Sequence, residues 1–386
     1  MSFDDGLDRG GRFLGREDIE AVSSPTAALF ANGPGELWGW CRPLAREMSF
    51  RGWNIHLHLL RCPFATGRER EVALSMEGID VVTGPSDPIG SFGKLFNDRC
   101  DVVIQLGGDL MFGRAMAAFH RIPLACYSYG YKKGLDRCDL KATAFDGMAR
   151  SMGKSVQVVG DLVSDGLRMD PEAPTPWRDG GGKRVLLFPG SRPWIRDVAR
   201  GYLSEMVPPL VDRLNLQVAS MLSPFSRQEE VESWRNAGLN PFTGATGAAL
   251  ADADLAVTQP GTNTLELLDR AVPSIVAIPF DFLRSIPLSG IKGWLFSLPG
   301  GSSLKEKVLR RAARKRGFVA WPNRLAEEEI MPELVGDISP VQLADAVANI
   351  LTEEGKLSKQ RVRLEKLRGE VDSPSSVFCD LIERLV

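Results

Sequence analysis

The chain has 386 residues, long enough for two domains that each bury a core of their own. Hydrophobic residues make up 44% and charged residues 25%, as in ordinary globular proteins, and a net charge of -2 excludes nucleic-acid binding through bulk positive charge. The polar N-terminal segment MSFDDGLDRGGRFLGREDIE, the lack of a long apolar stretch and six scattered cysteines predict a cytoplasmic protein with reduced thiols, without a secretory signal, spanning helix or zinc site.

Short apolar runs alternate with longer amphipathic segments in the first half. The expected strands are Thr26–Ala31, Asn54–Leu60, Asp101–Leu106, Pro123–Ser128 and Ser155–Val159. The expected helices between them are Glu36–Arg51, Arg68–Met76 and Asp109–His120. Strands that alternate with helices predict a parallel sheet with helices on both faces.

The proline- and glycine-rich segment MDPEAPTPWRDGGGK interrupts this alternation and predicts a linker over residues 171–183. It separates an N-terminal domain, residues 1–170, from a C-terminal domain, residues 184–355, in which the alternation of strands and helices restarts. Residues 356–386 are expected to form C-terminal helices, for which packing back on the N-terminal domain is one arrangement. The predicted fold class is therefore α/β, with two doubly wound halves.

Two glycine-containing turns follow predicted strands of the first half, at the edge where parallel sheets bind ligands. The turn NGPGE, Asn32–Glu36, lacks the G-x-G-x-x-G register, and Glu36 would repel a phosphate, so a dinucleotide site fits poorly. A tight turn in which Glu36 favours the helix dipole and a role toward substrate both stay open. In the turn LGGD, Asp109 either caps the next helix, which its position favours, or acts as a general base toward a hydroxyl.

Two further turns in the second half together predict a nucleotide diphosphate site. The turn FPGSR offers the amides of Gly190 and Ser191 and the forked cation of Arg192. The turn Thr258–Glu266 joins a Pro-Gly step to a hydroxyl-rich helix start that suits phosphate. Glu266 there can accept hydrogen bonds from two ribose hydroxyls or serve as a capping-box carboxylate.

An apolar stretch, IPLSGIKGWLF over residues 286–296, lies near a basic stretch, KEKVLRRAARKR over residues 305–316. The basic stretch holds seven lysines and arginines against one glutamate, which is either a solvated helix face or a patch that adsorbs to an anionic membrane. The residues expected to contact lipid in the second case are Trp294, Phe296, Arg310, Arg311 and Arg314.

Three motifs of the second half resemble the lipid-A-disaccharide synthases in order and spacing. They are PGSR (Pro189–Arg192), PGTNTLE (Pro260–Glu266) and WPNRLAEEEIMPEL (Trp321–Leu334), where that family carries LPGSR, SGTATLE and LPN-x-x-A-x-x-x-VPEL. The first half is similar more loosely, with NGPGE at the place of a Ser-Gly-Asp turn. The resemblance runs from about residue 26 to residue 351 and is strong only in the second half.

The resemblance implies a GT-B fold, in which two Rossmann-like domains face each other across a cleft. It also implies an inverting transfer of an acylated glucosamine from UDP to a lipid-linked sugar phosphate, without metal or cofactor, by a peripheral protein at the inner face of a membrane. A homodimer is expected by analogy. Asp109 would deprotonate the acceptor hydroxyl, and Glu36, which replaces a family aspartate, is the second expected catalytic residue. The residues expected to bind the nucleotide sugar are Gly190, Ser191, Arg192, Gly261, Thr262, Asn263, Thr264, Glu266 and Asn323.

Departures from the family pattern lie mostly in the acceptor half. Asp161 stands where the family has a histidine, and YSYGYKK, Tyr127–Lys133, replaces a tryptophan-rich segment. A different lipid or sugar acceptor therefore stays open. So do two other functions: a nucleotide-sugar epimerase, which would need no lipid acceptor, and a relative that binds a nucleotide sugar without turnover.

Overall fold

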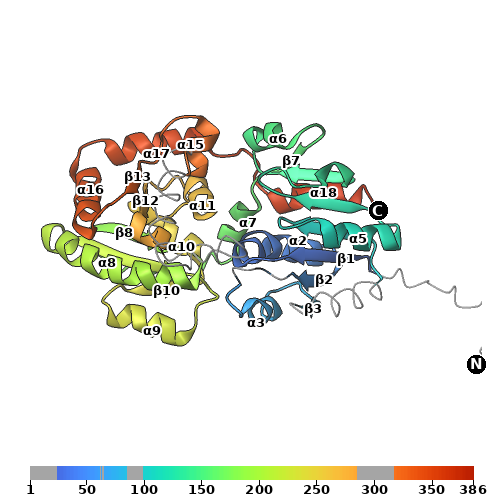
Figure 1. Ribbon diagram of the computed structural model, residues 1–386, viewed down its shortest axis with the longest axis horizontal. Coiled ribbons are helices and arrows are strands. Elements are labelled where there is room, and N and C mark those ends of the chain that lie inside the picture. Colours follow the sequence, from blue (N-terminus) through green and yellow to red (C-terminus); the bar gives the residue numbers. More distant parts are fainter. Residues whose placement is uncertain (1–23, 61, 63–64, 85–98, 285–316) are drawn as a thin grey trace, which may run out of the picture.

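The computed structural model describes residues 24–60, 62, 65–84, 99–284 and 317–386 of the chain. Its strands form two separate parallel sheets that lie side by side, each flanked by helices (Figure 1). The predicted α/β class with two doubly wound halves is therefore confirmed.

The two sheets have closely related strand orders, and every strand pair in them is parallel. The first sheet, in the order β3-β2-β1-β4-β5-β6-β7, contains β1 (Thr26–Ala31), β2 (Asn54–Leu59), β3 (Val81–Thr83), β4 (Val102–Leu106), β5 (Leu124–Tyr127), β6 (Leu140–Thr143) and β7 (Gln157–Val158). The second, in the order β10-β9-β8-β11-β12-β13, contains β8 (Lys183–Phe188), β9 (Leu216–Leu222), β10 (Pro241–Thr243), β11 (Leu255–Thr258), β12 (Ser274–Pro279) and β13 (Glu333–Gly336). The order reverses beside β1 and beside β8, which opens a crevice at the carboxyl ends of these strands.

The central strands are apolar along their whole length because both of their faces are covered. Residues 27–31 of β1 and 185–187 of β8 are fully buried. In the first sheet, Leu29 of β1 lies in register with Leu57 of β2 and Ile104 of β4. Burial on both faces accounts for the continuous hydrophobic runs that made these strands predictable.

The helices of the first half are α1 (Pro34–Glu36), a π-helical turn (Leu37–Cys41), α2 (Arg42–Phe50), α3 (Glu69–Leu74), α5 (Met111–His120), α6 (Asp146–Met152) and α7 (Leu162–Arg168). Those of the second half and the C-terminus are α8 (Pro193–Arg213), α9 (Gln228–Asn236), α10 (Thr246–Ala251), α11 (Asn263–Asp269), α12 (Phe280–Arg284), α15 (Trp321–Ala326), α16 (Pro340–Thr352), α17 (Lys356–Leu367) and α18 (Pro374–Glu383). Among the described helices, none has both the length and the apolar character needed to cross a membrane.

Two helices connect the halves. The C-terminal α18 packs against α2, α7 and β6, so the end of the chain lies on the first half (Figure 1). Phe378 of α18 is fully buried, and Arg51, at the end of α2, donates to Asp380 at 2.7 Å and to Glu383 at 3.0 Å. In the middle of the molecule, α7 contacts α10 and α11 of the second half.

The longer predicted elements agree with the structure, and four short strands were missed. The segment before β8 has neither helix nor strand over residues 169–182, and its three consecutive glycines all have positive φ. The strands β3, β6, β10 and β13 were not predicted, because three or four residues carry too little periodicity to stand out.

Candidate functional site

Loops from the two halves meet at the carboxyl edges of both sheets. A Cβ added at Gly35, in the turn after β1, would lie 3.7 Å from the Thr262 hydroxyl in the turn after β11. A narrow cavity of about 80 Å³ lies between these loops. Its lining includes Pro34, Gly35 and Trp38 from the first half and Gly190, Ser191, Thr262, Asn263 and Glu266 from the second. The structure therefore brings together most of the residues of the two predicted nucleotide-binding turns.

The turn after β8 is held in shape by groups that the sequence did not single out. Gly190 has φ +102, and a Cβ there would also lie 3.2 Å from Ile195, so glycine suits this position. Arg196, in the first turn of α8 and 1% exposed, donates to the Ser191 carbonyl at 2.6 Å and forms a buried ion pair with Glu230 of α9. The sequence shows only that Arg196 follows Arg192 by one helical turn. That spacing does not tell whether Arg196 is buried or exposed.

Arg192 lies at the start of α8 beside this turn. Its guanidinium is 5.9 Å from the centre of the Trp194 ring, and the side chain is half-buried. Arg192 is not part of the lining of the narrow cavity.

Some polar groups of the turn after β11 make hydrogen bonds within the protein, and others line the narrow cavity. The Thr264 hydroxyl donates to the Gly261 carbonyl at 2.8 Å and accepts from the Trp321 amide at 3.2 Å, and Thr264 is fully buried. Thr264 therefore joins α11 to α15, whereas Thr262 and Asn263 line the narrow cavity. Gln259 donates to the Pro189 carbonyl at 2.7 Å and so ties this turn to the turn after β8.

Glu266 presents a carboxyl group to the narrow cavity. No hydrogen bond or ion pair joins its side chain to another residue of the described chain. Burial raises the pKa of Glu266 to about 7, and the charge of Asp161 adds to the shift. An unpaired, partly buried carboxyl group at a cavity wall is a ready acceptor for ligand hydroxyls.

A second, wide cavity of about 910 Å³ lies beside the narrow one, and Thr262 lines both. The first half contributes Glu36, Trp40, Gly107, Tyr129, Lys132 and Arg150 to its lining, and the second contributes Gly261, Trp321, Arg324 and Glu327. Trp38 and Trp40, which lie two positions apart in the π-helical turn, line different cavities: Trp38 the narrow one and Trp40 the wide one.

The two predicted catalytic carboxylates lie in different places. Glu36 lines the wide cavity, and its side chain packs next to Gly107, where an added Cβ would be 3.3 Å from it. Asp109 is exposed, accepts from the Met111 amide at 3.0 Å and is not part of the wide cavity's lining. Asp109 therefore closes a turn just before α5, whose N-cap position is Leu110.

Behind the wide cavity, aromatic side chains converge on Asp161, one of the residues that depart from the family pattern. The Tyr129 hydroxyl donates to Asp161 at 2.6 Å and accepts from the Trp40 indole at 3.0 Å, and the Tyr127 hydroxyl lies 3.4 Å from the same carboxylate. Asp161 also caps α7 through the Val163 amide at 3.2 Å. Burial raises the pKa of Asp161 to about 6, although the Tyr129 hydrogen bond opposes the shift.

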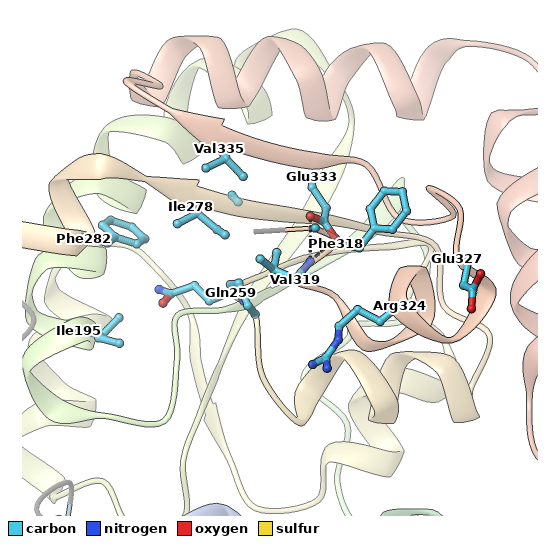
Figure 2. Close-up of a pocket in the computed structure, with 13 residues that line it drawn as sticks. Ile195, Gln259, Ile278, Phe282, Phe318, Val319, Arg324, Glu327, Glu333 and Val335 are labelled. Carbon is cyan, nitrogen blue, oxygen red and sulfur yellow. Dashed lines mark hydrogen bonds between the residues drawn. The ribbon is translucent and has the colours of Figure 1, made fainter. Parts of the chain in front are cut away.

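An apolar cavity of about 880 Å³ opens on the other side of α15 (Figure 2). Its walls are mostly hydrophobic: Ile195, Ala277, Ile278, Phe282, Phe318, Val319 and Val335. Arg324 and Glu327 line both this cavity and the wide one, so the two are neighbours. Glu333 is anchored in its wall by the Val319 and Ala320 amides at 3.0 and 2.9 Å.

The placement of Asn323 corrects the role expected for it. Asn323 is fully buried; its amide donates to the Met331 carbonyl and to Glu333, and its oxygen accepts from the Ile330 and Met331 amides. All its hydrogen-bonding groups are therefore occupied in holding α15 to β13, and none faces the narrow cavity.

Other expectations concern residues or groups that the structure does not place in a site. Within the described ranges, no cluster of three or more His, Cys, Asp or Glu side chains is arranged to hold a metal ion. The expected lipid-contacting residues lie outside the described residues; they are Trp294, Phe296, Arg310, Arg311 and Arg314.

Comparison with curated proteins finds lipid-A-disaccharide synthases. The chain is 29% identical over 237 residues to that of Alkalilimnicola ehrlichii, 28% over 249 residues to one from Pseudomonas putida, and 25% over 252 residues to one from Pseudomonas aeruginosa. These matches cover 57 to 61% of this chain and span 55 to 61% of the relatives' own length. No protein-family model matches the chain.

Several solved structures share the fold of this chain at low sequence identity. MurG of Acinetobacter baumannii is 14% identical with a TM-score of 0.53, over 93% of this chain and 100% of its own. UDP-GlcNAc 2-epimerase of Neisseria meningitidis bound to UDP-GlcNAc is 10% identical with a TM-score of 0.55, over 93% and 100%. MnaA of S. aureus with UDP is 14% identical with a TM-score of 0.55, over 94% and 98%.

These comparisons confirm the predicted resemblance and the predicted fold. At such identities the solved structures establish the arrangement of the two halves and not the reaction. The chain is thus similar to lipid-A-disaccharide synthases over about three-fifths of its length, and it has the GT-B fold of two Rossmann-like sheets facing across a cleft.

Proposed function

We propose that the protein is a glycosyltransferase that moves an acylated glucosamine from a UDP-sugar to a lipid-linked sugar phosphate, with inversion and without a metal. The observation that carries this proposal is the narrow cavity, in which Gly190, Ser191, Thr262, Asn263 and Glu266 meet at the junction of the halves. Backbone amides and hydroxyls of the two turns would bind the diphosphate, and the unpaired carboxyl group of Glu266 would accept from the ribose hydroxyls. Arg192, next to Ser191 at the start of α8, is the proposed cation for the departing UDP.

Glu36 is the proposed base, because it is the predicted carboxylate that lines the wide cavity next to Thr262. The acceptor hydroxyl would attack the anomeric carbon from the face opposite UDP. A new C–O bond forms as the bond to the diphosphate oxygen breaks, the hydroxyl proton passes to Glu36, and the electron pair leaves with UDP. Asp109, whose carboxylate accepts from the Met111 amide and does not line this cavity, is not needed for that step.

The apolar cavity of Figure 2 suits the acyl part of the donor. It shares Arg324 and Glu327 with the wide cavity, and its lining at Gln259 and Pro260 directly precedes the turn at Gly261–Asn263. An acyl chain attached to a sugar at that turn could therefore enter it and bury apolar surface. Peripheral binding at the cytoplasmic face of a membrane, and a homodimer, remain part of the proposal by analogy with the family.

The epimerase alternative shares the fold, and the wide cavity is the observation that weighs against it. An epimerase acts on the nucleotide sugar alone, whereas about 910 Å³ beside the narrow cavity gives room for a second substrate. Incubation with a UDP-sugar alone separates the two: appearance of an epimer without an acceptor would overturn the transferase proposal.

Calorimetric titration with UDP, and with ADP and GDP as controls, tests the donor site. We expect selective binding of UDP that weakens in Glu266→Ala and in Arg192→Ala. Glu205→Ala, which removes an exposed carboxylate from α8, is the matched control and should bind as the wild type does. Equal binding of all three nucleotides, or none, would contradict the proposal.

A further inference from the structure

The wide cavity has a wall of basic side chains that lack acidic partners. Lys132, Arg150 and Arg324 all line it, the first two from the first half and the third from α15. No ion pair or hydrogen bond joins these three side chains to another residue in the part of the chain described here. Arg42, another basic residue near the junction, is paired with Asp170 at 2.5 Å.

Two of these cations lie at or beside α15. The Arg324 guanidinium lies over the Trp321 ring, 4.0 Å from its centre, so stacking holds the flat group in place while its N–H edges stay unpaired. The turn of α6 that carries Arg150 approaches α15 closely: a Cβ added at Gly147 would lie 3.7 Å from the Arg150 guanidinium and 3.3 Å from Leu325. Arg150, from the first half, therefore lies close to α15 of the second half.

The charges of the lining favour an anion. Three cations face two carboxylates, Glu36 and Glu327, and Glu36 is already the proposed base. Arg150 and Arg324 are exposed, so water screens part of the repulsion among the three cations, and a bound anion would relieve the rest. The unpaired wall therefore indicates a ligand with at least one negative group.

The remaining lining indicates what carries that negative group. The rings of Trp40, Tyr129 and Trp321 meet edge to face, with 4.7 Å between the centres of Trp40 and Tyr129 and 5.6 Å between those of Tyr129 and Trp321. Such a surface packs against the apolar face of a sugar ring. An anionic sugar matches both features, and a phosphate monoester supplies two charges and the oxygen acceptors that arginine prefers.

We infer that Lys132, Arg150 and Arg324 form the subsite for the phosphate of the acceptor, with its sugar ring against Tyr129 and Trp321. This inference rests on the proposed transferase function and adds the residues that select an anionic acceptor. Lys132 belongs to YSYGYKK, the segment that departs from the family pattern, so this subsite is built by the chain's own residues. The donor's diphosphate is the other anion in the reaction, and the test must separate the two.

The test compares two double variants by calorimetry. Lys132→Gln/Arg150→Gln removes two charges from the wall. Lys133→Gln/Lys154→Gln removes two charges from exposed positions that do not line the cavity, and it controls for the net charge of the molecule. The probes are UDP alone, then N-acetylglucosamine 1-phosphate, N-acetylglucosamine and inorganic phosphate, each added to the UDP-saturated protein and to the free protein.

We expect the sugar phosphate to bind the wild type more tightly than the neutral sugar or inorganic phosphate does. In the wall variant its affinity should fall about tenfold or more, because two charge-assisted contacts are lost, while UDP binds unchanged. The control variant should match the wild type with every probe. Unaltered binding of the sugar phosphate to the wall variant would overturn the inference, and so would weaker UDP binding there, since the cations would then serve the donor.

The same titrations distinguish an error in the proposed UDP site from an error in the proposed phosphate subsite. A protein that binds no UDP but binds the sugar phosphate through this wall would contradict the transferase function and leave the subsite standing. Selective UDP binding with no preference for the phosphorylated sugar would leave the donor site standing and remove the subsite.

Discussion

Glu266 couples the stability of the empty protein to pH. Its pKa is raised to about 7, so between its ordinary value near 4.5 and pH 7 the folded chain binds more protons than the unfolded chain. The free energy of unfolding therefore falls as the pH rises through this window. The loss is complete above pH 7, where Glu266 is ionised in the folded chain. Glu266→Gln should stabilise the ligand-free protein at pH 8, by something on the order of 2 kcal/mol, and change nothing at pH 4.5.

Urea unfolding at the two pH values measures this effect. Glu205→Gln, an exposed change on α8, should leave stability unaltered at both. The same Glu266→Gln protein should gain less stability from added UDP than the wild type, because it lacks the carboxylate that we propose accepts from the ribose hydroxyls. Equal stabilisation by the substitution at pH 4.5 and pH 8 would show that the charge of Glu266 is not the cause.

The two predicted catalytic carboxylates provide a reciprocal test. Glu36→Gln should lower kcat by about 10² to 10⁴, the usual contribution of a positioned base, without changing UDP binding. Asp109→Asn keeps an oxygen that can accept from the Met111 amide, so it should retain activity and lose at most about 1 kcal/mol of stability. Initial rates of transfer and urea unfolding measure both. An inactive Asp109→Asn beside an active Glu36→Gln would reverse the assignment.

At this scale the sequence predicted residue types better than residue roles. Glu266 and Thr262 lie at the narrow cavity. This placement was expected, because a turn at the carboxyl end of a buried parallel strand lies at the edge of the sheet where ligands bind. Asn323 lies in an equally recognisable motif, yet its partners come from Ile330, Met331 and Glu333, and no sequence pattern shows that an amide is already occupied. Arg196 was missed for a related reason, since Glu230, with which it forms its ion pair, is distant along the chain.

At the scale of elements, the apolar cavity tests the acyl part of the proposal. Val335 of β13 lines this cavity and is 38% exposed, so a larger side chain can enter the space without disturbing the core. Val335→Trp should lower transfer from a long-chain acyl donor by about tenfold or more, because a misplaced donor loses its alignment, and spare UDP binding and a short-chain donor. Rates with donors of two chain lengths measure the effect.

Val341→Trp is the matched control for this change. Val341 lies on α16, is 50% exposed and is not part of the cavity's lining, so both donors should react as in the wild type. An equal loss for long and short chains in Val335→Trp would indicate a general disturbance of β13 and argue against an acyl site in this cavity.

The elements that were predicted best are those with an uninterrupted run of buried apolar residues. β1, β4 and β8 read as strands because both faces are buried, and α8 has the period of a long helix. β13 and β10 depend on pairing at the sheet edges, which propensity does not show. The division of the site into three cavities could not be predicted, because it depends on how α15 lies against the turn after β11.

At the scale of the whole molecule, α18 connects the last part of the chain to the acceptor half. Phe378 is fully buried there, 5.9 Å from the ring of Tyr127, which in turn contacts Asp161. The packing of α18 thus supports the aromatic groups behind the wide cavity. α18 also packs against α7, whose Val163 lines the narrow cavity.

Phe378→Ala should therefore destabilise the first half more than the second. Loss of a buried phenylalanine costs about 3 to 5 kcal/mol, which we expect to fall on the first half as a lower unfolding temperature. Transfer should weaken because Trp40 and Tyr129 lose their support. UDP binding, which we propose the turns after β8 and β11 make, should change little below that temperature. Val377→Ala, on the same helix but 37% exposed, is the control and should cost under about 1 kcal/mol. If Phe378→Ala weakened UDP binding as strongly as transfer, the two halves would be shown to act as a single unit, and the donor site would depend on the C-terminal helix as much as the acceptor site does.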